Sequence, residues 1–525
     1  MKEKQFDIIL VSGDYHIDHP LNSTGVLKRV LEDNGYSVGI IEKPDWNSDD
    51  DFLKLGRPRL FFGVGSGSID SMLQNYNALL KPRKEQEFSP YDSKVPDRAV
   101  IVYTNALKRL FKGVPIVIGG VESSLRRFAH YDYQSNRLRK SILLDSKADL
   151  LVFGAGERPV LEIAERLDNG DGLEGIASTC IASSTVPEIF CLLPTFEEVS
   201  DDKKAFIRMQ SMFDNSKDIA QKTGNKFILQ YKAKPASTEW IDYIYSLPYS
   251  RNIPKYAKEF KMAQFSIVTH RGCFGNCSFC SISLHFGKKI VSRSEESILA
   301  EARRIRKHPD FKGYIDDLGG PSANMYGMDC KNAEFCSGNC ISCKKLDRSH
   351  KRLIRLMRRI REIKGIKKVF VRSGVRFDLA VDSMEYIKEL SEHHISGCLK
   401  IAPEHFSESV LKLMNKNNSS FDRFKKIFDK INKPLRQELR YYLMGAHPGE
   451  DEKDRKILKN ALRKLKNTES VQIFTPTPMS MSTCMFYTEM DPKTFKKISV
   501  VKKFSKKKRI KRSLLPPNKG VLQRF

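Results

Sequence analysis

The chain has 525 residues, of which 40% are hydrophobic, and it contains 31 Phe and 18 Tyr. A chain of this length and apolar content folds into two or three globular domains. The N-terminus, MKEKQFDIILVSGD, has no secretory h-region, and no stretch approaches the ~18 apolar residues that span a bilayer. We therefore expect a cytoplasmic protein without membrane contact.

The formal net charge is +28, and its basic excess is concentrated at the C-terminus. The stretch from Lys493 to Phe525 contains 13 Lys and Arg and no acid. Basic tails bind nucleic acid through phosphate contacts, but a solvated, disordered tail has the same composition. We expect residues 491–525 to be a basic, disordered tail, and nucleic acid is a candidate partner.

Short apolar strands alternate with helices in the first part of the chain. This alternation predicts a parallel sheet covered on both faces, with ligands at the carboxyl ends of its strands. We expect an α/β, doubly wound, Rossmann-like domain over residues 1–190 and a helical linker over 191–255. The predicted strands include IILV (8–11), VGII (38–41), RLFFGVG (59–65), AVIVYT (99–104), VPIVIGG (114–120) and ADLLVFGAG (148–156).

The segment ESSLRRFAHYDYQSNRLRKSI (122–142) combines many cations with hydroxyl-bearing aromatic residues. Two interpretations are equally open. It forms either a substrate-facing loop that recognises an anionic or aromatic group, or the charged surface of a helix.

A Gly-rich loop with three cysteines follows the short apolar run 265–268. Thiolates on such a loop can turn inward onto one ion or cluster, because little side-chain bulk stops the backbone from wrapping. A structural zinc or an electron-transfer four-iron cluster takes four ligands. Three cysteines leave one iron open to a small molecule, and the alternative is a zinc site completed by His270 or His285. The cysteines, spaced by four and three residues, are Cys273, Cys277 and Cys280.

Strand and helix patterns alternate again over residues 256–490. Six βα units in about 220 residues predict a partial (βα)6 barrel of the TIM type, with ligands at the carboxyl ends of its strands. Polar and glycine-rich motifs stand at these predicted ends: Gly319, Gly320, Pro321, Arg372, Ser373, Arg376, Glu404, His405 and His447.

A second set of cysteines lies in an insertion at residues 328–346, MDCKNAEFCSGNCISC and its flanks. Four cysteines satisfy either a closed zinc site or an auxiliary four-iron cluster. Both alternatives remain open for Cys330, Cys336, Cys340 and Cys343.

The loop pattern C-x3-C-x-aromatic-C, with Phe279 as the aromatic residue, resembles the cluster-binding loop of the radical S-adenosylmethionine (SAM) superfamily. The likeness to one family, the YgiQ family of radical SAM proteins (formerly UPF0313), covers residues 6–492. It is carried by VSGDYHIDHP, RLFFGVGSGSIDSM, SSLRRFAHYDY, HRGCFGNCSFCSIS, DLGGPSANMYGM, VRSGVRFDLA, KIAPEH and FTPTP.

This resemblance implies a [4Fe-4S] cluster on the three cysteines, whose open iron binds SAM and whose electron cleaves SAM to a 5'-deoxyadenosyl radical. It also implies an unidentified substrate and an electron donor such as flavodoxin or ferredoxin. Contacts to SAM are expected from Phe279, Gly319, Gly320, Pro321, Arg372, Ser373 and Arg376. Glu404, His405 and His447 are candidates for proton handling, and each is equally interpretable as a structural polar group.

The first domain resembles the cobalamin-binding-type domain that precedes the radical SAM barrel in several subfamilies. The ligating pattern of that family is D-x-H-x-x-G, and here His19 stands where the glycine should be, after Asp14 and His16. We therefore predict the fold without cobalamin. Two alternatives to the general radical SAM reading are an RNA-modifying enzyme that transfers methyl or methylthio groups and a zinc-binding interaction protein.

Overall fold

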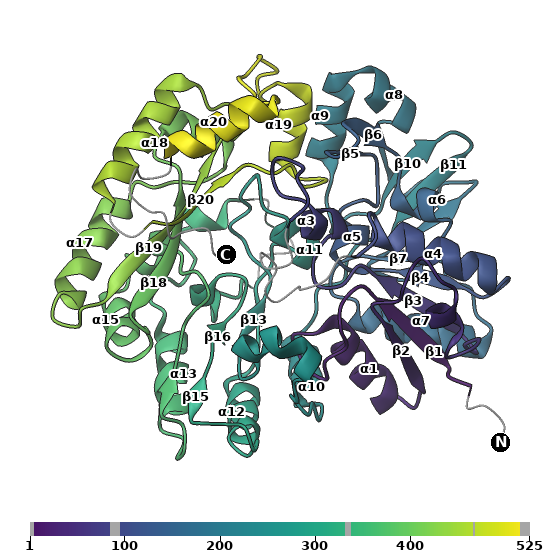
Figure 1. Cartoon of the computed structure of the whole chain (residues 1–525), viewed down its shortest axis with the longest axis horizontal. Helices are drawn as coiled ribbons and strands as arrows, with labels where there is room; N and C mark the ends of the chain where they lie inside the picture. The colour runs from purple at the N-terminus through teal and green to yellow at the C-terminus, as the bar shows by residue number, and fades with distance from the viewer. Residues whose placement is uncertain (1–4, 84–94, 331–335, 337, 466–467, 515–525) are drawn as a thin grey trace.

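The computed structural model describes residues 5–83, 95–330, 336, 338–465 and 468–514. It contains two α/β units that lie side by side (Figure 1). One is a nine-stranded sheet formed by the first half of the chain, and the other is a partial barrel formed by the second half. None of the helices in these ranges is both long and apolar enough to cross a membrane.

The strand order of the large sheet is β2-β1-β3-β4-β7-β8-β11-β10-β9. The first five strands are parallel; in register, Leu10 lies beside Ile40 on one side and Gly63 on the other. The strands are β1 (Ile8–Ser12), β2 (Val38–Glu42), β3 (Phe61–Gly65), β4 (Ile116–Ile118), β7 (Leu150–Val152), β8 (Thr179–Ser183), β9 (Cys191–Leu193), β10 (Ile219–Thr223) and β11 (Lys226–Gln230).

Helices cover both faces of this sheet, as the doubly wound prediction requires. One face packs against α1 (Ser23–Asp33), α7 (Glu157–Asn169) and α10 (Thr238–Ser246). The opposite face packs against α4 (Ala99–Leu110), α6 (Ile142–Ser146) and α9 (Lys203–Met212). Short elements connect these units: α2 (Asp50–Leu53), α3 (Ser71–Asn75), α5 (Gly120–Ser124), β5 (His130–Asp132), β6 (Arg137–Arg139) and α8 (Phe196–Asp201).

Two predicted elements of this half are wrong. AVIVYT is the first half of helix α4, not a strand: Val100, Tyr103 and Leu107 are buried at helical spacing, which a short apolar run does not reveal. The predicted helical linker contains β9, β10 and β11, which extend the sheet beyond residue 190. β11 pairs antiparallel with both β8 and β10, and a two-residue turn joins β10 to β11.

The segment 122–142 is neither a substrate-facing loop nor an exposed helix. Arg126 forms a buried ion pair with Asp70, and Arg98 pairs with Asp132. The guanidinium of Arg127 is fully buried between two phenylalanine rings. These charges therefore hold the N-terminal unit together from inside.

The second unit is the predicted partial barrel. Parallel pairs join β12 to β16, β15 to β17, β18 to β19, and β19 to β20. A bridge between Val375 and Ile401 links the chain after β17 to β18. The strands are β12 (Ile267–Val268), β15 (Tyr314–Ile315), β16 (Leu318–Gly319), β17 (Lys368–Val369), β18 (Cys398–Glu404), β19 (Glu438–Gly445) and β20 (Thr468–Ile473).

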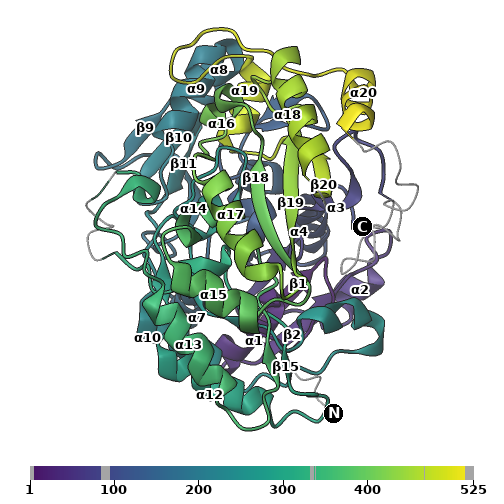
Figure 2. The same ribbon diagram turned by 90° about the vertical axis from the view of Figure 1, so that its left-hand side faces the viewer.

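Helices form the outer layer of the barrel, and Figure 2 shows α15 and α17 in front of β18 and β19. The main ones are α12 (Glu295–Ile305), α13 (Lys351–Arg361), α15 (Met384–His393), α17 (Phe421–Asn432) and α18 (Glu452–Lys464). Short elements complete the unit: η2 (Lys255–Ala263), β13 (His270–Arg271), α11 (Ile282–Phe286), β14 (Val291–Ser292), η3 (Ala323–Met325), η4 (Cys340–Ser342), α14 (Phe377–Ala380), α16 (Glu408–Leu413) and α19 (Met481–Thr488).

The described part of the tail is ordered, which corrects the prediction of disorder up to residue 514. Helix α20 (Phe504–Leu514) packs on the barrel, where Leu514 covers Gly445 at the end of β19. Lys507 is fully buried, and its Nζ donates to the hydroxyl of Tyr133 in the N-terminal unit at 2.8 Å. The helix thus joins both units, and residues 515–525 lie outside the described chain.

Candidate functional site

The three-cysteine loop runs from β13 to α11 and is held by two later parts of the barrel. The amide of Ser278 donates to the carbonyl of Met414, and the amide of Ser482 donates to the carbonyl of Ser278, both at 2.9 Å. The side chain of Asn415 donates to the carbonyl of Asn276 at 2.8 Å. These bonds fix a loop that has little regular structure of its own.

The three thiols are partly buried and lie close enough to affect one another. Burial raises the pKa of Cys280 to about 12, and it also raises the pKa of Cys273. A metal or cluster that binds them as thiolates therefore displaces protons. The set of donors, three cysteines on one loop, fits an iron–sulfur cluster with one iron left open.

Arg376 brings a positive charge to these thiols. Its Nη1 lies 4.0 Å from the sulfur of Cys277, and its other terminal nitrogen pairs with Asp378 at 2.5 Å. A Cβ at Gly275 would stand 2.5 Å from the same Nη1. Glycine is therefore required there for the guanidinium to approach the loop.

The two histidines considered as a fourth zinc ligand lie in different surroundings, and the Nε2 atom of His270 has no hydrogen-bond partner among the described residues. His270 lies against Gly320, where a Cβ would come within 2.6 Å of the imidazole. His285 lies 2.9 Å from the hydroxyl of Ser124, in the N-terminal unit. Burial lowers the pKa of both imidazoles to about 4, so they are neutral at neutral pH.

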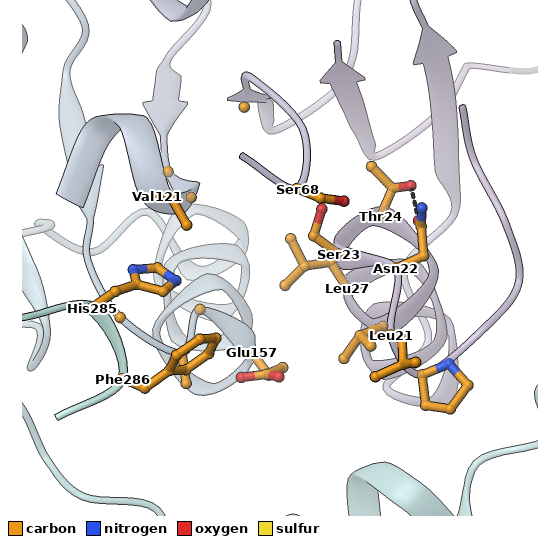
Figure 3. Close-up of a pocket in the computed structure, with 18 of the residues that line it drawn as sticks. Leu21, Asn22, Ser23, Thr24, Leu27, Ser68, Val121, Glu157, His285 and Phe286 are labelled. Carbon is orange, nitrogen blue, oxygen red and sulfur yellow. Dashed lines mark hydrogen bonds between the residues drawn. The ribbon is translucent and has the colours of Figure 1, made fainter. Parts of the chain in front are cut away.

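A cavity of about 600 Å³ lies between the two units, and both predicted ligand-binding edges face it. From the large sheet it is lined by the ends of β1, β3, β4 and β7, and from the barrel by β12 and the end of β16. Figure 3 shows Val121, His285 and Phe286 on one side and Leu21 and Leu27 on the other. The strand-end residues at the two sides are Ser12, Gly65, Gly119, Gly120, Gly154, Gly319, Gly320, Pro321 and Ser373.

At two of the strand-end glycines, the packing of the protein leaves room for a side chain. A Cβ at Gly65 would meet nothing closer than 3.9 Å, and one at Gly119 nothing closer than 3.7 Å. The backbone of Gly119 is extended, with φ −157°. The missing side chains therefore widen the cavity, which is what close approach of a ligand requires.

One acidic group projects into this largely apolar space (Figure 3). Glu157 pairs with Arg271 at 2.7 Å through one oxygen, while its buried Oε2 has no partner among the described residues. Burial acts to raise the pKa of Glu157, but the Arg271 guanidinium outweighs it, so the pKa is lowered. The cavity thus offers a charge-balanced pair with one free acceptor.

Only some of the predicted SAM contacts line the cavity. Ser373 lines the cavity, and its amide and hydroxyl both donate to Asp317. Arg372 is exposed, with its guanidinium over the ring of Phe370, and does not line the cavity. Arg376 stands at the cysteine loop instead.

The candidates for proton handling are placed in different surroundings. Glu404, which has a positive φ of 66°, lies close enough to Cys280 for its charge to raise the pKa of that thiol. His405 and His447 are fully buried and do not line the cavity. His447 lies 2.7 Å from the hydroxyl of Ser482, so its position supports the segment that holds the cysteine loop.

Phe279 also lies outside the cavity lining. Its ring meets the imidazole of His447 edge-on, with 6.4 Å between centroids.

The sequence alone did not predict the residues that hold the site, because single polar residues on barrel loops carry no distinctive pattern. These residues are Ser278, Asn415, Ser482, Asp317 and Glu157.

Two family models match the chain. The model described as "Radical SAM N-terminal" matches residues 1–270, and that of the radical SAM superfamily matches residues 267–461. The two matches meet at β12 and β13, just before the cysteine loop. The chain is therefore a radical SAM enzyme, a class whose cofactors are a [4Fe-4S] cluster and SAM.

Curated relatives give the family within this class. A UPF0313 protein of Methanosarcina acetivorans is 43% identical, with 98% of this chain and 76% of that protein covered. One from Methanosarcina mazei is 41% identical (98% and 92%), and one from Clostridium botulinum Okra is 44% identical (97% and 84%). The chain belongs to the UPF0313 family, as its motifs predict.

Solved structures share the two-unit fold at low sequence identity. The radical SAM methyltransferase TsrM of Kitasatospora setae, with cobalamin and a [4Fe-4S] cluster bound, has a TM-score of 0.52 at 15% identity, covering 91% of this chain and 77% of its own. The cobalamin-dependent enzyme OxsB has a TM-score of 0.50 at 13% identity, covering 93% and 55%. The likeness confirms the predicted fold class.

Proposed function

We propose that Cys273, Cys277 and Cys280 hold one [4Fe-4S] cluster and that the enzyme uses it to cleave SAM reductively. The observation that carries the proposal is the guanidinium of Arg376 beside Cys277 in a loop of three mutually close thiols. When bound, the cluster supplies the electron that splits SAM into methionine and a 5'-deoxyadenosyl radical. The cavity end formed by Gly319, Gly320, Pro321 and Ser373 is the place proposed for SAM.

The residues of the chain have separate parts in this proposal. Arg376 balances negative charge on the thiolates, and the bonds from Met414, Asn415 and Ser482 hold the loop in place. Glu404 is the proton-handling candidate whose charge acts on Cys280, whereas His405 and His447 are better assigned to positioning. The apolar walls of the cavity would keep water away from the 5'-deoxyadenosyl radical.

Iron analysis under anaerobic conditions tests the cluster assignment. We expect reconstituted wild-type protein to be brown, and the C273A/C277A/C280A triple variant to lose about four irons per chain relative to it. Cys191, an isolated exposed cysteine, offers the matched control C191A, which should keep the wild-type iron content. Equal iron in the triple variant and the wild type would refute the assignment.

A second candidate function is corrinoid-assisted group transfer, and the room at the N-terminal end of the cavity favours it. Gly65 and Gly119 leave space there that the protein does not need, and TsrM and OxsB, which share the fold, bind cobalamin. Neither His16 nor His19, the two histidines of the Asp14 segment, is among the residues that line the cavity. His16 lies 3.0 Å from the Thr24 hydroxyl, and His19 lies 2.9 Å from the carbonyl of Gln264.

RNA modification stays a prediction that rests on charge alone. In the described part of the tail, α20 is packed on the barrel and Lys507 points inward. The other cations of α20 are carried on this packed helix and not on a free arm. This arrangement gives RNA less to bind than the composition suggests.

A further inference from the structure

The cavity between the two units is larger than the end at which we place SAM. Its volume is about 600 Å³, which is twice the lower limit of roughly 300 Å³ for a site that holds a drug-sized ligand. Gly319, Pro321 and Ser373 line one end, and the rest of the wall comes mainly from the large sheet, α1, α7 and α11. A second small molecule therefore has room in the cavity beside SAM.

Two large apolar side chains line this remaining part and are open to solvent. Phe286, at the end of α11, is 46% exposed, and Leu21, just before α1, is 38% exposed. Figure 3 shows them on opposite sides of the cavity. Large apolar groups that face each other across a hollow are typical of a surface that a ligand covers. We therefore expect the body of the ligand to be mostly apolar.

One carboxylate stands between these two walls (Figure 3). Glu157 is the first residue of α7, and its side chain is only 10% exposed. Its Oε1 accepts from Nη2 of Arg271 at 2.7 Å. Its Oε2 is buried and has no hydrogen-bond partner among the described residues. An orphaned oxygen of this kind costs free energy unless a bound molecule supplies the missing donor.

The charges around this oxygen restrict what can bind to it. Burial acts to raise the pKa of Glu157, but the Arg271 guanidinium outweighs it and the pKa is lowered, so the carboxylate is ionised. An ionised carboxylate only accepts hydrogen bonds, and the ligand must therefore be the donor.

The donor is expected to be neutral. Glu157 and Arg271 balance each other, and His285, which also lines the cavity, is neutral at neutral pH because burial lowers its pKa to about 4. A cationic ligand would bury a net positive charge beside the pair, whereas a neutral N–H or O–H group would not.

We propose that Glu157 is a specificity-determining residue whose Oε2 accepts a hydrogen bond from a neutral N–H or O–H group of a small, mostly apolar substrate. The apolar body of that substrate lies between Phe286 and Leu21. This inference rests on the proposed function, because it takes the cavity to be the place where the radical made from SAM meets its target.

Binding of three naphthalene probes to the full-length, anaerobically reconstituted enzyme tests the proposal without knowledge of the substrate. The probes are 2-naphthol, a neutral donor, 2-methoxynaphthalene, which has no donor, and 2-(aminomethyl)naphthalene, a cation at neutral pH. Equilibrium dialysis should show 2-naphthol binding about tenfold more tightly than either of the others, because a hydrogen bond to a charged acceptor is worth about that factor. Equal affinities, tightest binding of the cation, or no binding of 2-naphthol overturns the proposal.

Substitution of Glu157 should remove this preference. In E157Q the amide oxygen takes the bond from Arg271, so the amide nitrogen faces the cavity as a donor. Both 2-naphthol and 2-methoxynaphthalene can accept from it, so their affinities should become equal. Glu162 lies on the same helix, pairs with Arg166 and does not line the cavity, so E162Q is the matched control and should keep the tenfold preference. An E157Q protein that keeps it too contradicts the proposal.

A second variant separates the donor preference from general binding in the cavity. F286A removes one apolar wall, so it should weaken 2-naphthol and 2-methoxynaphthalene by a similar factor and leave the ratio of their affinities near tenfold. Loss of that ratio in F286A would show that the preference does not come from Glu157. The wild-type probe series stands on its own if E157Q does not fold.

The dialysis uses no reductant and follows no product, so this proposal and reductive SAM cleavage can fail separately. A corrinoid also carries neutral amide donors and is the other source of the same chemistry. If hydroxocobalamin binds the wild type and E157Q weakens its binding while the preference for 2-naphthol stays unchanged, the acceptor serves a corrinoid amide. That result overturns the assignment of Glu157 to a substrate.

Discussion

At the scale of single residues, the site depends on one cation that approaches three thiols. Arg376 reaches Cys277 because Gly275 has no side chain and because Asp378 orients the guanidinium. Buried thiols resist ionisation. A fixed positive charge beside them lowers the cost of holding thiolates, and this is the contribution we assign to Arg376.

Replacement of Arg376 by alanine should weaken cluster binding without unfolding the protein. Loss of a charge-assisted contact costs about 1.5 kcal/mol, which corresponds to roughly tenfold faster iron loss to a chelator. R376K keeps the charge but not the forked geometry of the guanidinium, so its rate of iron loss should fall between those of the wild type and R376A. The partly exposed pair of Arg166 with Glu162 supplies the control R166A. An R376A protein that loses iron no faster than R166A would contradict the role.

At this scale the three cysteines and the strand-end glycines can be singled out from the sequence, because their spacing has few structural explanations. Their roles as cluster ligands and SAM contacts stay predictions. Gly320, for example, is required by its contact with His270. Arg372 occupies a predicted position but points away, since the direction of a side chain after a strand depends on local twist. Asn415 and Ser482 act through contacts more than 130 residues from the loop in sequence, and no local pattern reveals such pairs.

At the scale of elements, the burial pattern in the structure distinguishes helix from strand where the spacing of apolar residues in the sequence is ambiguous. A six-residue apolar run such as 99–104 suits a buried strand as well as a helix. Strands β9–β11 carry polar and exposed residues, so they did not look like sheet strands. Helix α20 is mostly basic, and only its buried face of Lys507, Ile510 and Leu514 shows that it packs.

The buried lysine of α20 should make stability depend on pH. Burial lowers the pKa of Lys507 to about 8, below its unfolded value of roughly 10.4. Between these values the unfolded chain holds a proton that the folded chain has released, so the free energy of unfolding rises with pH by up to about 1.4 kcal/mol per unit.

Urea unfolding of wild type and K507M from pH 7 to 10.5 measures this effect as the difference between their free energies of unfolding. The isosteric variant has no charge to bury, so its advantage over the wild type should be greatest near pH 7 and shrink above pH 8. Loss of the bond to Tyr133 adds an offset that does not change with pH in this range. A difference that stays constant from pH 7 to 10.5 would rule out a lysine with a lowered pKa.

At the scale of the whole molecule, the two units meet around one cavity that neither could form alone. The sheet contributes its carboxyl edge, the barrel contributes the Gly319–Pro321 turn, and α20 contacts both units. Alternating strands and helices predicted both units, but the way they face each other depends on side-chain contacts far apart in sequence. The cavity was therefore beyond prediction from the sequence.

Filling the N-terminal end of this cavity tests the corrinoid candidate. Gly119→Val should keep the fold, since a Cβ there meets no atom closer than 3.7 Å, but its methyl groups enter the cavity. If hydroxocobalamin binds the wild type, G119V should weaken binding by at least tenfold and G119A by less. Gly172, where a Cβ has open space, supplies the control G172V. Hydroxocobalamin that binds none of the proteins, or binds all of them equally, removes this candidate.

The most direct test of the central claim is the release of 5'-deoxyadenosine. Anaerobically reconstituted wild-type protein, given SAM and a strong reductant, should release 5'-deoxyadenosine, measured by chromatography against a standard. The C273A/C277A/C280A variant should release none above the reductant blank, while C191A should match the wild type. A wild-type protein that holds about four irons on the three cysteines yet releases no 5'-deoxyadenosine would contradict the claim that this loop serves reductive SAM cleavage.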